Sequence, residues 1–106
     1  MPKYLLEVDY TLEGVRGLKA EGGSARVAAA TALIEGLGGK VESFYFGFGA
    51  SDVFVIADMP DNVSVAAAAL AVSAGGGATA RTVVLLTASE LDAAAKTQTT
   101  YRAPGS

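Results

Sequence analysis

The chain of 106 residues contains neither cysteine nor histidine. Without cysteine it forms no disulfide or iron–sulfur cluster and performs no thiol chemistry, and without histidine it lacks the commonest metal ligand and the commonest general base. It also has no nucleotide-binding signature. We therefore expect no cofactor and no metal, with a site made of carboxylates alone as the one metal-binding alternative.

Clustered positive charge and long apolar runs are missing too. Eight Lys and Arg are scattered among eleven Asp and Glu, for a net charge of −3, which argues against binding to the phosphate backbone of nucleic acids. No segment approaches the roughly 18 apolar residues of a membrane span, and Met1-Pro2-Lys3 leads directly into a strand-like segment without a signal sequence. These features predict a soluble cytoplasmic protein with no nucleic-acid or membrane partner.

The apolar content of 51% fits one small globular domain, near the size at which a monomer is only marginally stable, so oligomerisation would help it. We assign the domain to residues 1–96. Residues 97–106 have no periodicity and few apolar groups, which predicts an extended or disordered tail.

Periodicity and turn residues predict four strands and four helical segments. The expected strands cover residues 3–10, 40–46, 52–58 and 78–86, and the expected helical segments are a short turn after Thr11, a main helix over 25–37 capped by Ser24, a helix from Asp61 or Asn62 to 74, and a short helix over 88–96. In the third segment Val63, Ala66, Ala67, Leu70 and Ala74 form the expected buried stripe. Thr87 and Glu90 form a capping box for the fourth.

This order predicts an α+β fold, the ferredoxin-like split βαβ pattern, with a four-stranded antiparallel sheet in the order 4-1-3-2 and a short C-terminal helix. Two helices cover only one face of such a sheet, yet residues 53–56 and 83–84 offer apolar side chains to both faces. A second apolar face needs a partner. We expect a homodimer or higher homo-oligomer in which two sheets pack face to face, burying about 800 Å² on each partner.

Several segments together resemble the GYD domain family. They are Tyr4 to Leu6, Tyr10 to Val15, Glu21 to Ser24, Leu37 to Tyr45, Asp52 to Asp61, and Arg81-Thr82, so the resemblance extends over residues 2–96. It implies a dimeric α/β barrel and, because the family is uncharacterised, no particular chemistry. The Gly-Tyr-Asp that names the family would fall at Gly49 to Asp52, where Ser51 occupies the aromatic position. Any role of that tyrosine in relatives is lost here or replaced by a hydroxyl.

Four charged residues on the expected sheet are candidates for a ligand site. Asp52 ends the glycine-rich turn, Gly47 to Asp52, at the start of the next strand, and it either faces a cleft or orders the turn. Arg81 lies among apolar neighbours and needs a carboxylate, carbonyl groups or an anionic ligand, unless it points past the sheet edge into solvent. Glu7 and Asp9 lie on the side opposite Tyr4 and Leu6, where they either pair with Arg81 or form an acid–base group with a raised pKa.

Arg26 lies in the first turn of the main helix, where the helix dipole disfavours a cation. Glu21, Asp52 or a bound anion would explain its position, and a solvated arginine is the alternative. Aromatic residues near the central turn either hold a flat ligand or pack the core and the dimer; these are Tyr10, Tyr45, Phe46 and Phe48.

Two functions fit these features, and a third rests on analogy. The first is a module that binds a small organic or anionic ligand in a cleft at the sheet, with Arg81, Asp52, Glu7, Asp9, Tyr45 and Arg26 as candidate ligand-binding residues. The second is a non-catalytic structural or regulatory assembly subunit. The resemblance to the dimeric barrel group adds a cofactor-free oxygenase or isomerase by fold analogy alone.

Overall fold

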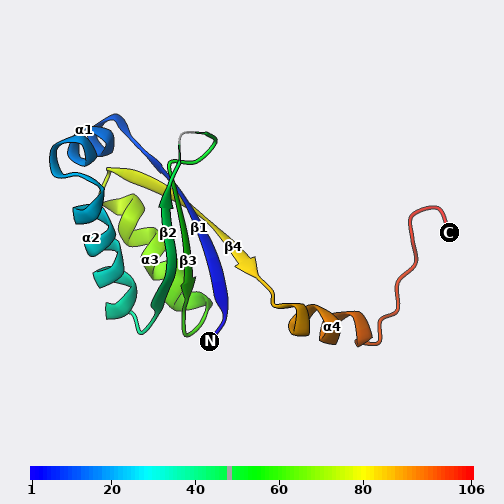
Figure 1. Cartoon of the computed structure of the whole chain (residues 1–106). Helices are drawn as coiled ribbons and strands as arrows, with labels where there is room; N and C mark the ends of the chain where they lie inside the picture. The colour runs from blue at the N-terminus through cyan, green and yellow to red at the C-terminus, as the bar shows by residue number, and fades with distance from the viewer. Residues whose placement is uncertain (48) are drawn as a thin grey trace.

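The computed structural model describes residues 1–47 and 49–106, and it contains four antiparallel strands and four helices (Figure 1). In chain order they are β1 (Lys3–Tyr10), α1 (Leu12–Glu21), α2 (Gly23–Gly36), β2 (Lys40–Phe46), β3 (Val53–Asp58), α3 (Asn62–Ala74), β4 (Ala78–Leu85) and α4 (Ala88–Lys96). The predicted α+β class, antiparallel sheet and short C-terminal helix are confirmed.

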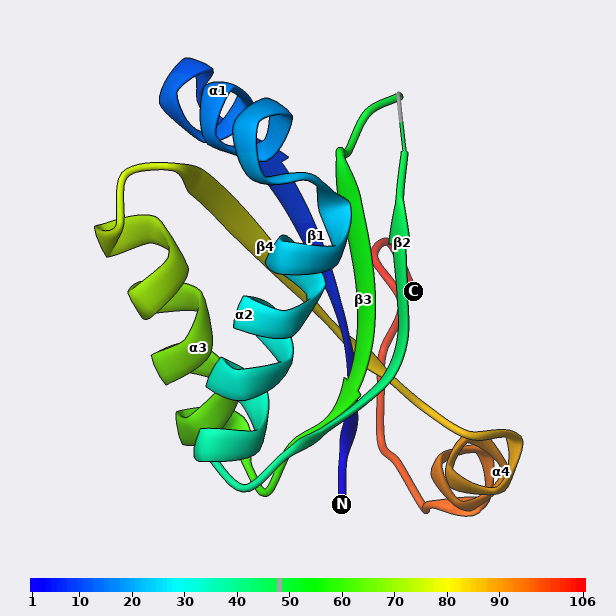
Figure 2. The same ribbon diagram turned by 60° about the vertical axis from the view of Figure 1, so that its left-hand side comes forward.

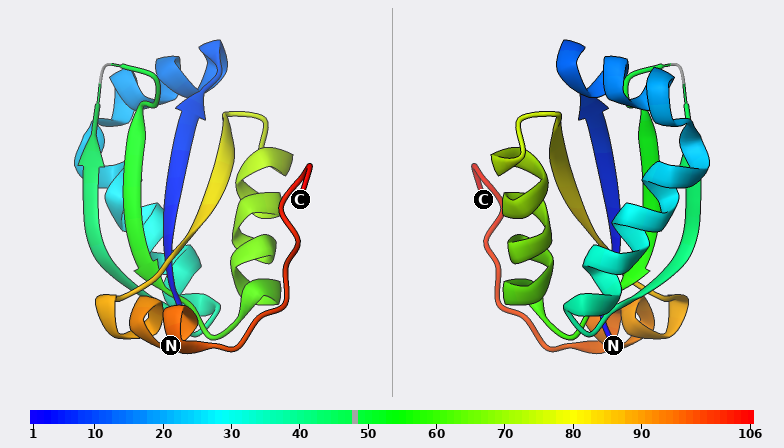
Figure 3. Two further views of the ribbon diagram at one scale, coloured as in Figure 1. Left: turned by 90° about the vertical axis from the view of Figure 1, so that its right-hand side faces the viewer. Right: turned by 90° about the vertical axis from the view of Figure 1, so that its left-hand side faces the viewer.

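The strands are hydrogen-bonded in the order β2-β3-β1-β4, with β1 and β3 at the centre. Counted from the β4 edge, the same neighbours read 4-1-3-2. Figure 3 (left) shows the strands side by side, and Figure 2 shows α1, α2 and α3 together on one side of the sheet. The other side, which we call the open face, carries none of these three helices.

The core lies between the sheet and the helix layer. Tyr4 and Leu6 of β1 are buried there, as the alternation of β1 predicts, beside Val53, Val55 and Ala57 of β3. The hydroxyl of Tyr4 donates a hydrogen bond to the side-chain oxygen of Asn62, at the first residue of α3. Central strand and helix are thereby joined by both apolar packing and a polar contact.

Two predictions about the first helices are wrong. The expected short turn is a ten-residue helix, α1, whose N-cap Thr11 accepts a hydrogen bond from the backbone N–H of Gly14. Ser24 does not cap α2, because α2 already begins at Gly23 and has Gly22 as its N-cap. A single residue therefore joins the two helices, and its φ of +85° is one that glycine adopts without strain.

The predicted buried stripe of α3 is also wrong. Val65 and Ala68 are the buried residues of this helix, whereas Val63 is 77% exposed and Leu70 is 71% exposed. Nine of the thirteen residues of α3 are alanine or valine, so apolar residues occur at many angles around its axis and their spacing does not select one face. Asp61 caps α3 as predicted and shares a capping box with Ser64.

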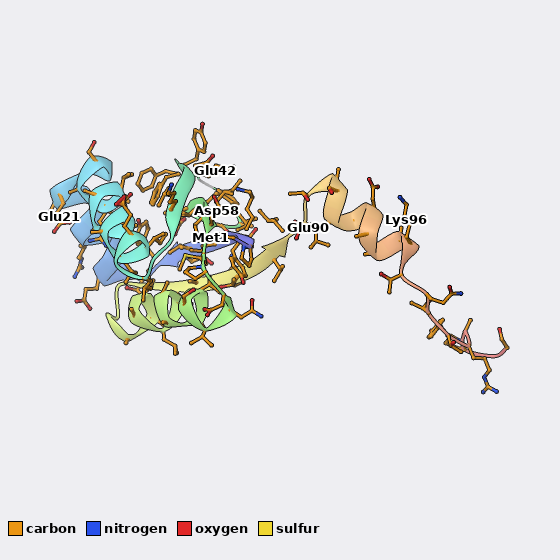
Figure 4. The ribbon with its side chains drawn as sticks, turned by 90° about the horizontal axis from the view of Figure 1, so that it is seen from below. Met1, Glu21, Glu42, Asp58, Glu90 and Lys96 are labelled. Atoms are coloured by element: carbon orange, nitrogen blue, oxygen red, sulfur yellow. The ribbon has the colours of Figure 1, made fainter. Side chains whose placement is uncertain are left out.

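The edge strand β2 contains a bulge between Val41 and Ser43. Glu42, the extra residue, lies near Asp58 at the end of the sheet where the chain begins (Figure 4), and the ammonium of Lys3 lies 2.9 Å from a carboxylate oxygen of each. These two hydrogen bonds raise the pKa of Lys3 above its usual value. They tie β1 to β2 and β3 at that end.

The C-terminal part extends away from the body of the domain (Figures 1 and 4). Residues 86–106 are exposed throughout, and 97–106 contain no helix or strand. Thr87 and Glu90 form the predicted capping box of α4. We call residues 86–106 the C-terminal arm.

Candidate functional site

A pocket of about 350 Å³ lies at the end of the helix layer, where α1, α2 and the C-terminal end of α3 meet. The last residue of β1, Tyr10, and the first residue of β4, Ala78, contribute from the sheet. Leu18 of α1 and Leu33 of α2 supply apolar walls, and Arg26 supplies a positive charge. An apolar cavity with a few polar groups is the usual form of a small-molecule site.

Tyr10 is positioned by its backbone as well as by its ring. Its N–H donates a 2.9 Å hydrogen bond to a carboxylate oxygen of Asp52, and the N–H of Asp52 donates to the carbonyl of Val8 at 2.9 Å. Burial raises the pKa of the Tyr10 phenol. The positive charge of Arg26 lowers this pKa, and the negative charge of Asp52 raises it. At neutral pH the pocket therefore contains an uncharged hydroxyl near a guanidinium.

The partner of Arg26 is Glu21, the last residue of α1, at 3.7 Å between Nη1 and Oε2. This was one of the three partners that the sequence analysis allowed. Glu21 and Glu13 both line the pocket, so one cation faces two carboxylates there. Such a lining provides a binding group for an anion and acceptors for a hydroxyl or amino group.

One wall of the pocket is formed by glycines. Gly14 and Gly17 are three residues apart on one side of α1, and both line the pocket together with Gly75 and Gly77. A Cβ on Gly14 would lie 1.8 Å from the carbonyl oxygen of Gly77, so the two backbones meet there without space for a side chain. The N–H of Thr11 donates to the same carbonyl at 3.0 Å.

A second group of polar residues lies on the open face. Arg81 of β4 donates to a carboxylate oxygen of Asp9 and to the hydroxyl of Ser51, both at 2.6 Å, and its Nε lies 3.6 Å from Glu7. Glu7 is directly opposite Arg81 in the β1–β4 register. The hydrogen bond to Asp9 is the main cause of a raised pKa for Arg81. The pairing of Arg81 with both acids is one of the arrangements predicted from the sequence.

The candidate ligand-binding residues thus lie in different parts of the structure and do not form one site. Arg81, Glu7 and Asp9 come together on the open face, whereas Arg26 lies in the pocket and Asp52 holds the backbone of β1. Tyr45 lies on β2 opposite Phe54 of β3 and is 71% exposed. Phe46 lies on the helix side, with its ring 5.3 Å from that of Phe44 and next to Gly23; Phe48 is outside the described residues.

Sequence reasoning missed Ser51 as a partner of Arg81 and missed the glycine-lined wall of the pocket. Ser51 is only 2% exposed, although it follows a turn rich in glycine. The paired spacing of Gly14 and Gly17, with three consecutive glycines at 75–77, was the available signal for a close approach of backbones.

Among residues 1–47 and 49–106, no helix has the length and apolar character needed to cross a membrane. Within the same ranges, no three acidic side chains converge to form a metal site. The pocket and the polar group on the open face are the two candidate sites.

The family model described as "GYD domain" matches residues 4–95. No curated protein and no solved structure matches the chain significantly.

Proposed function

We propose that this chain, which belongs to the GYD domain family, binds a small organic acid in the pocket between α1, α2 and α3. The family name states no reaction, so the proposal rests on the residues of the pocket. The observation that carries this proposal is the presence of Tyr10 and Arg26 in one cavity with apolar walls. Arg26 binds the carboxylate of the ligand, since a guanidinium offers two parallel N–H donors to it. The uncharged hydroxyl of Tyr10 accepts or donates a second hydrogen bond.

The two glutamates narrow the class of ligand. Glu13 and Glu21 repel a simple dianion but accept hydrogen bonds from a hydroxyl or amino group. A ligand with one carboxylate and one such donor, a hydroxy acid or an amino acid, satisfies all three charged residues. Its carbon skeleton packs against Leu18 and Leu33.

A ligand titration with a matched pair of variants tests this proposal. The purified protein is heated with hydroxy acids, amino acids and aromatic carboxylates in turn, and a ligand at a hundredfold excess over its Kd should add about 2.7 kcal/mol to the stability. Arg26→Gln should abolish that increase. Arg16→Gln, which removes an arginine of α1 that does not line the pocket, should leave it unchanged. Equal binding by both variants, or binding of none of these classes, contradicts the proposal.

The open face supports a homodimer as the form in which the protein works. Phe54 is 37% exposed and Val83 is 41% exposed there, with Leu5 and Ile56 between them in the register of the central strands. Apolar side chains on a sheet face are stable in water when a second layer covers them, and two such faces pack about 10 Å apart. In this dimer the Arg81 group lies at the rim of the contact between the sheets.

Two valines on the same strand provide the test for the dimer. Val83 points to the open face, and Val84 pairs with Tyr4 and points to the helix side, where it is nevertheless exposed. Val83→Asp should convert the dimer to a monomer in sedimentation and native mass measurements, whereas Val84→Asp should leave it dimeric. A monomeric wild-type protein at micromolar concentration contradicts this part of the proposal.

The assembly subunit remains the second candidate, and the same open face favours it. A subunit of this kind would dimerise as above but would show no stabilisation with any ligand of the panel. The ligand titration therefore separates the two functions.

A further inference from the structure

The C-terminal arm, residues 86–106, has no packing partner within its own chain. Every residue in it is exposed, and α4 contains no buried residue. Its three largest apolar side chains are Leu86, Leu91 and Tyr101, and the last two are 59% and 80% exposed. A surface segment with its large apolar groups in water points to an absent contact.

Helix α4 has an apolar side and a polar side. Ala88, Leu91 and Ala95 follow one another at spacings of three and four residues, so they lie on the same side of the helix, while Ser89 and Ala93 lie on another. An isolated helix of nine residues is marginal in water even with good caps. Tertiary packing of its apolar side is the usual source of the missing stability.

The dimensions of the whole chain agree with a missing partner. A compact monomer of 10.6 kDa exposes about 5,500 Å², whereas this chain exposes 7047 Å². Its radius of gyration is 16.8 Å, against about 13 Å for a compact domain of this length. The surplus surface exceeds the roughly 800 Å² that each partner buries in a stable interface.

The direction of the arm indicates which molecule covers it. β4 runs past the end of the sheet, and α4 and the tail lie on the open side, opposite α1, α2 and α3 (Figure 2). Only Leu86 and Thr87 separate β4 from α4. A molecule that packs against the open face would therefore also contact the arm. The charged residues of α4 are two acids, Glu90 and Asp92, and one base, Lys96. The helix therefore lacks the cationic polar side that binds an anionic membrane surface.

We propose that the C-terminal arm of each chain packs against a second copy of the same chain, with Leu91 as the central apolar contact. This inference rests on the homodimer proposed above and adds a second interface to it. The arm then contributes to the stability of the assembly and not to that of the individual domain.

The direct test is contact between chains, read by NMR on the full-length protein. Protein with ¹³C-labelled leucine methyl groups is mixed with unlabelled protein, and an isotope-filtered NOE experiment records only contacts between copies. The methyl groups of Leu91 should show NOEs to the unlabelled chain. A dimer in which the Leu91 methyl groups show no NOE to the unlabelled chain overturns the proposal.

A matched pair of variants on α4 supplies the second measurement. Leu91→Gln should raise the dimer dissociation constant by about tenfold, because it removes a buried leucine from the interface. Ala93→Gln, on another side of the same helix, should leave that constant unchanged. If the two variants dimerise equally well while Val83→Asp is monomeric, the sheet dimer stands and the arm proposal fails. If the wild type is monomeric, both fail, and ligand binding is judged separately with Arg26→Gln.

Discussion

Arg81 on β4 and Asp9 on β1 form an ion pair across neighbouring strands, with 2.6 Å between Nη1 and Oδ2. The same guanidinium donates to Ser51, which lies two residues before the start of β3 and is almost fully buried. Arg81 thus connects the edge strand β4, the central strand β1 and the entry to β3. Lysine has no planar fork and would not reach both acceptors in this way.

The Ser51 hydroxyl should contribute to stability mainly through Arg81. We predict that Ser51→Ala lowers the free energy of unfolding by about 1.5 kcal/mol, since a hydrogen bond to a charged donor is lost. In an Arg81→Met background the same substitution should cost about 0.5 kcal/mol or less. Chemical denaturation of the four proteins measures the coupling, and an equal cost in both backgrounds would show that the two side chains act independently.

The phenol of Tyr10 should titrate above its ordinary pKa of 10.0, because burial disfavours the phenolate. Since folding favours the neutral form, this contribution to stability is present below pH 10 and is lost as the pH rises through the higher folded-state pKa. Arg26→Gln should raise the Tyr10 pKa further by removing the nearby positive charge.

Site-resolved ¹³C NMR of the tyrosine rings measures these values, with Arg16→Gln as the control for loss of one arginine elsewhere on the helix layer. An unchanged Tyr10 pKa in Arg26→Gln would mean that the guanidinium does not face the phenol.

The N-terminal capping box of helix α4 should weaken in acid. The pKa of Glu90 is lowered from 4.5 because the backbone N–H of Thr87 donates to its carboxylate. A lowered folded-state pKa stabilises the helix above pH 4.5, and this stabilisation disappears as the pH falls through the lower value. The backbone chemical shifts of residues 88–96 should therefore move toward coil values on acidification. Glu90→Gln retains an acceptor without a charge, so its shifts should vary much less with pH.

Two glycines of α1 should respond to alanine in opposite directions. Gly14→Ala should destabilise the domain by about 3 kcal/mol, because its Cβ would overlap the carbonyl oxygen of Gly77 and force the backbones apart. Within the described part of the chain nothing lies within 4 Å of a Cβ built on Gly17, so Gly17→Ala should stabilise α1 by about 0.5 to 1 kcal/mol. Urea denaturation compares the two, and a similar effect of both substitutions would contradict the close approach of α1 to Gly77.

The sequence was sufficient for β1 because its alternation is strong. Tyr4 and Leu6 are buried while Glu7 and Asp9 lie on the open face, which period two alone predicts. It was insufficient for α3, where Val63 and Val65 are equally apolar and only the position of the sheet decides which one is buried. Local patterns locate an element reliably, but the buried side of a uniformly apolar helix depends on its neighbours.

The candidate site also has one part that the sequence predicts and one part that depends on the packing of the elements. Charge reasoning identified Arg26 and Arg81 as residues that need partners, and Glu21 and Asp9 are those partners. The glycines indicated a close approach of backbones, but the position of the pocket was not predictable, because Gly14 and Gly77 meet there although they are 63 positions apart in the chain. Such a juxtaposition arises from the packing of whole elements and leaves little trace in local spacing.

The bulge at Glu42 has a consequence for how copies of this chain associate. β2 is an outer strand, and an uninterrupted outer strand presents a regular row of N–H and C=O groups that recruits strands of other molecules into ribbons and fibrils. An extra residue breaks that row and twists the strand locally. Addition of further strands at the β2 edge is thereby disfavoured.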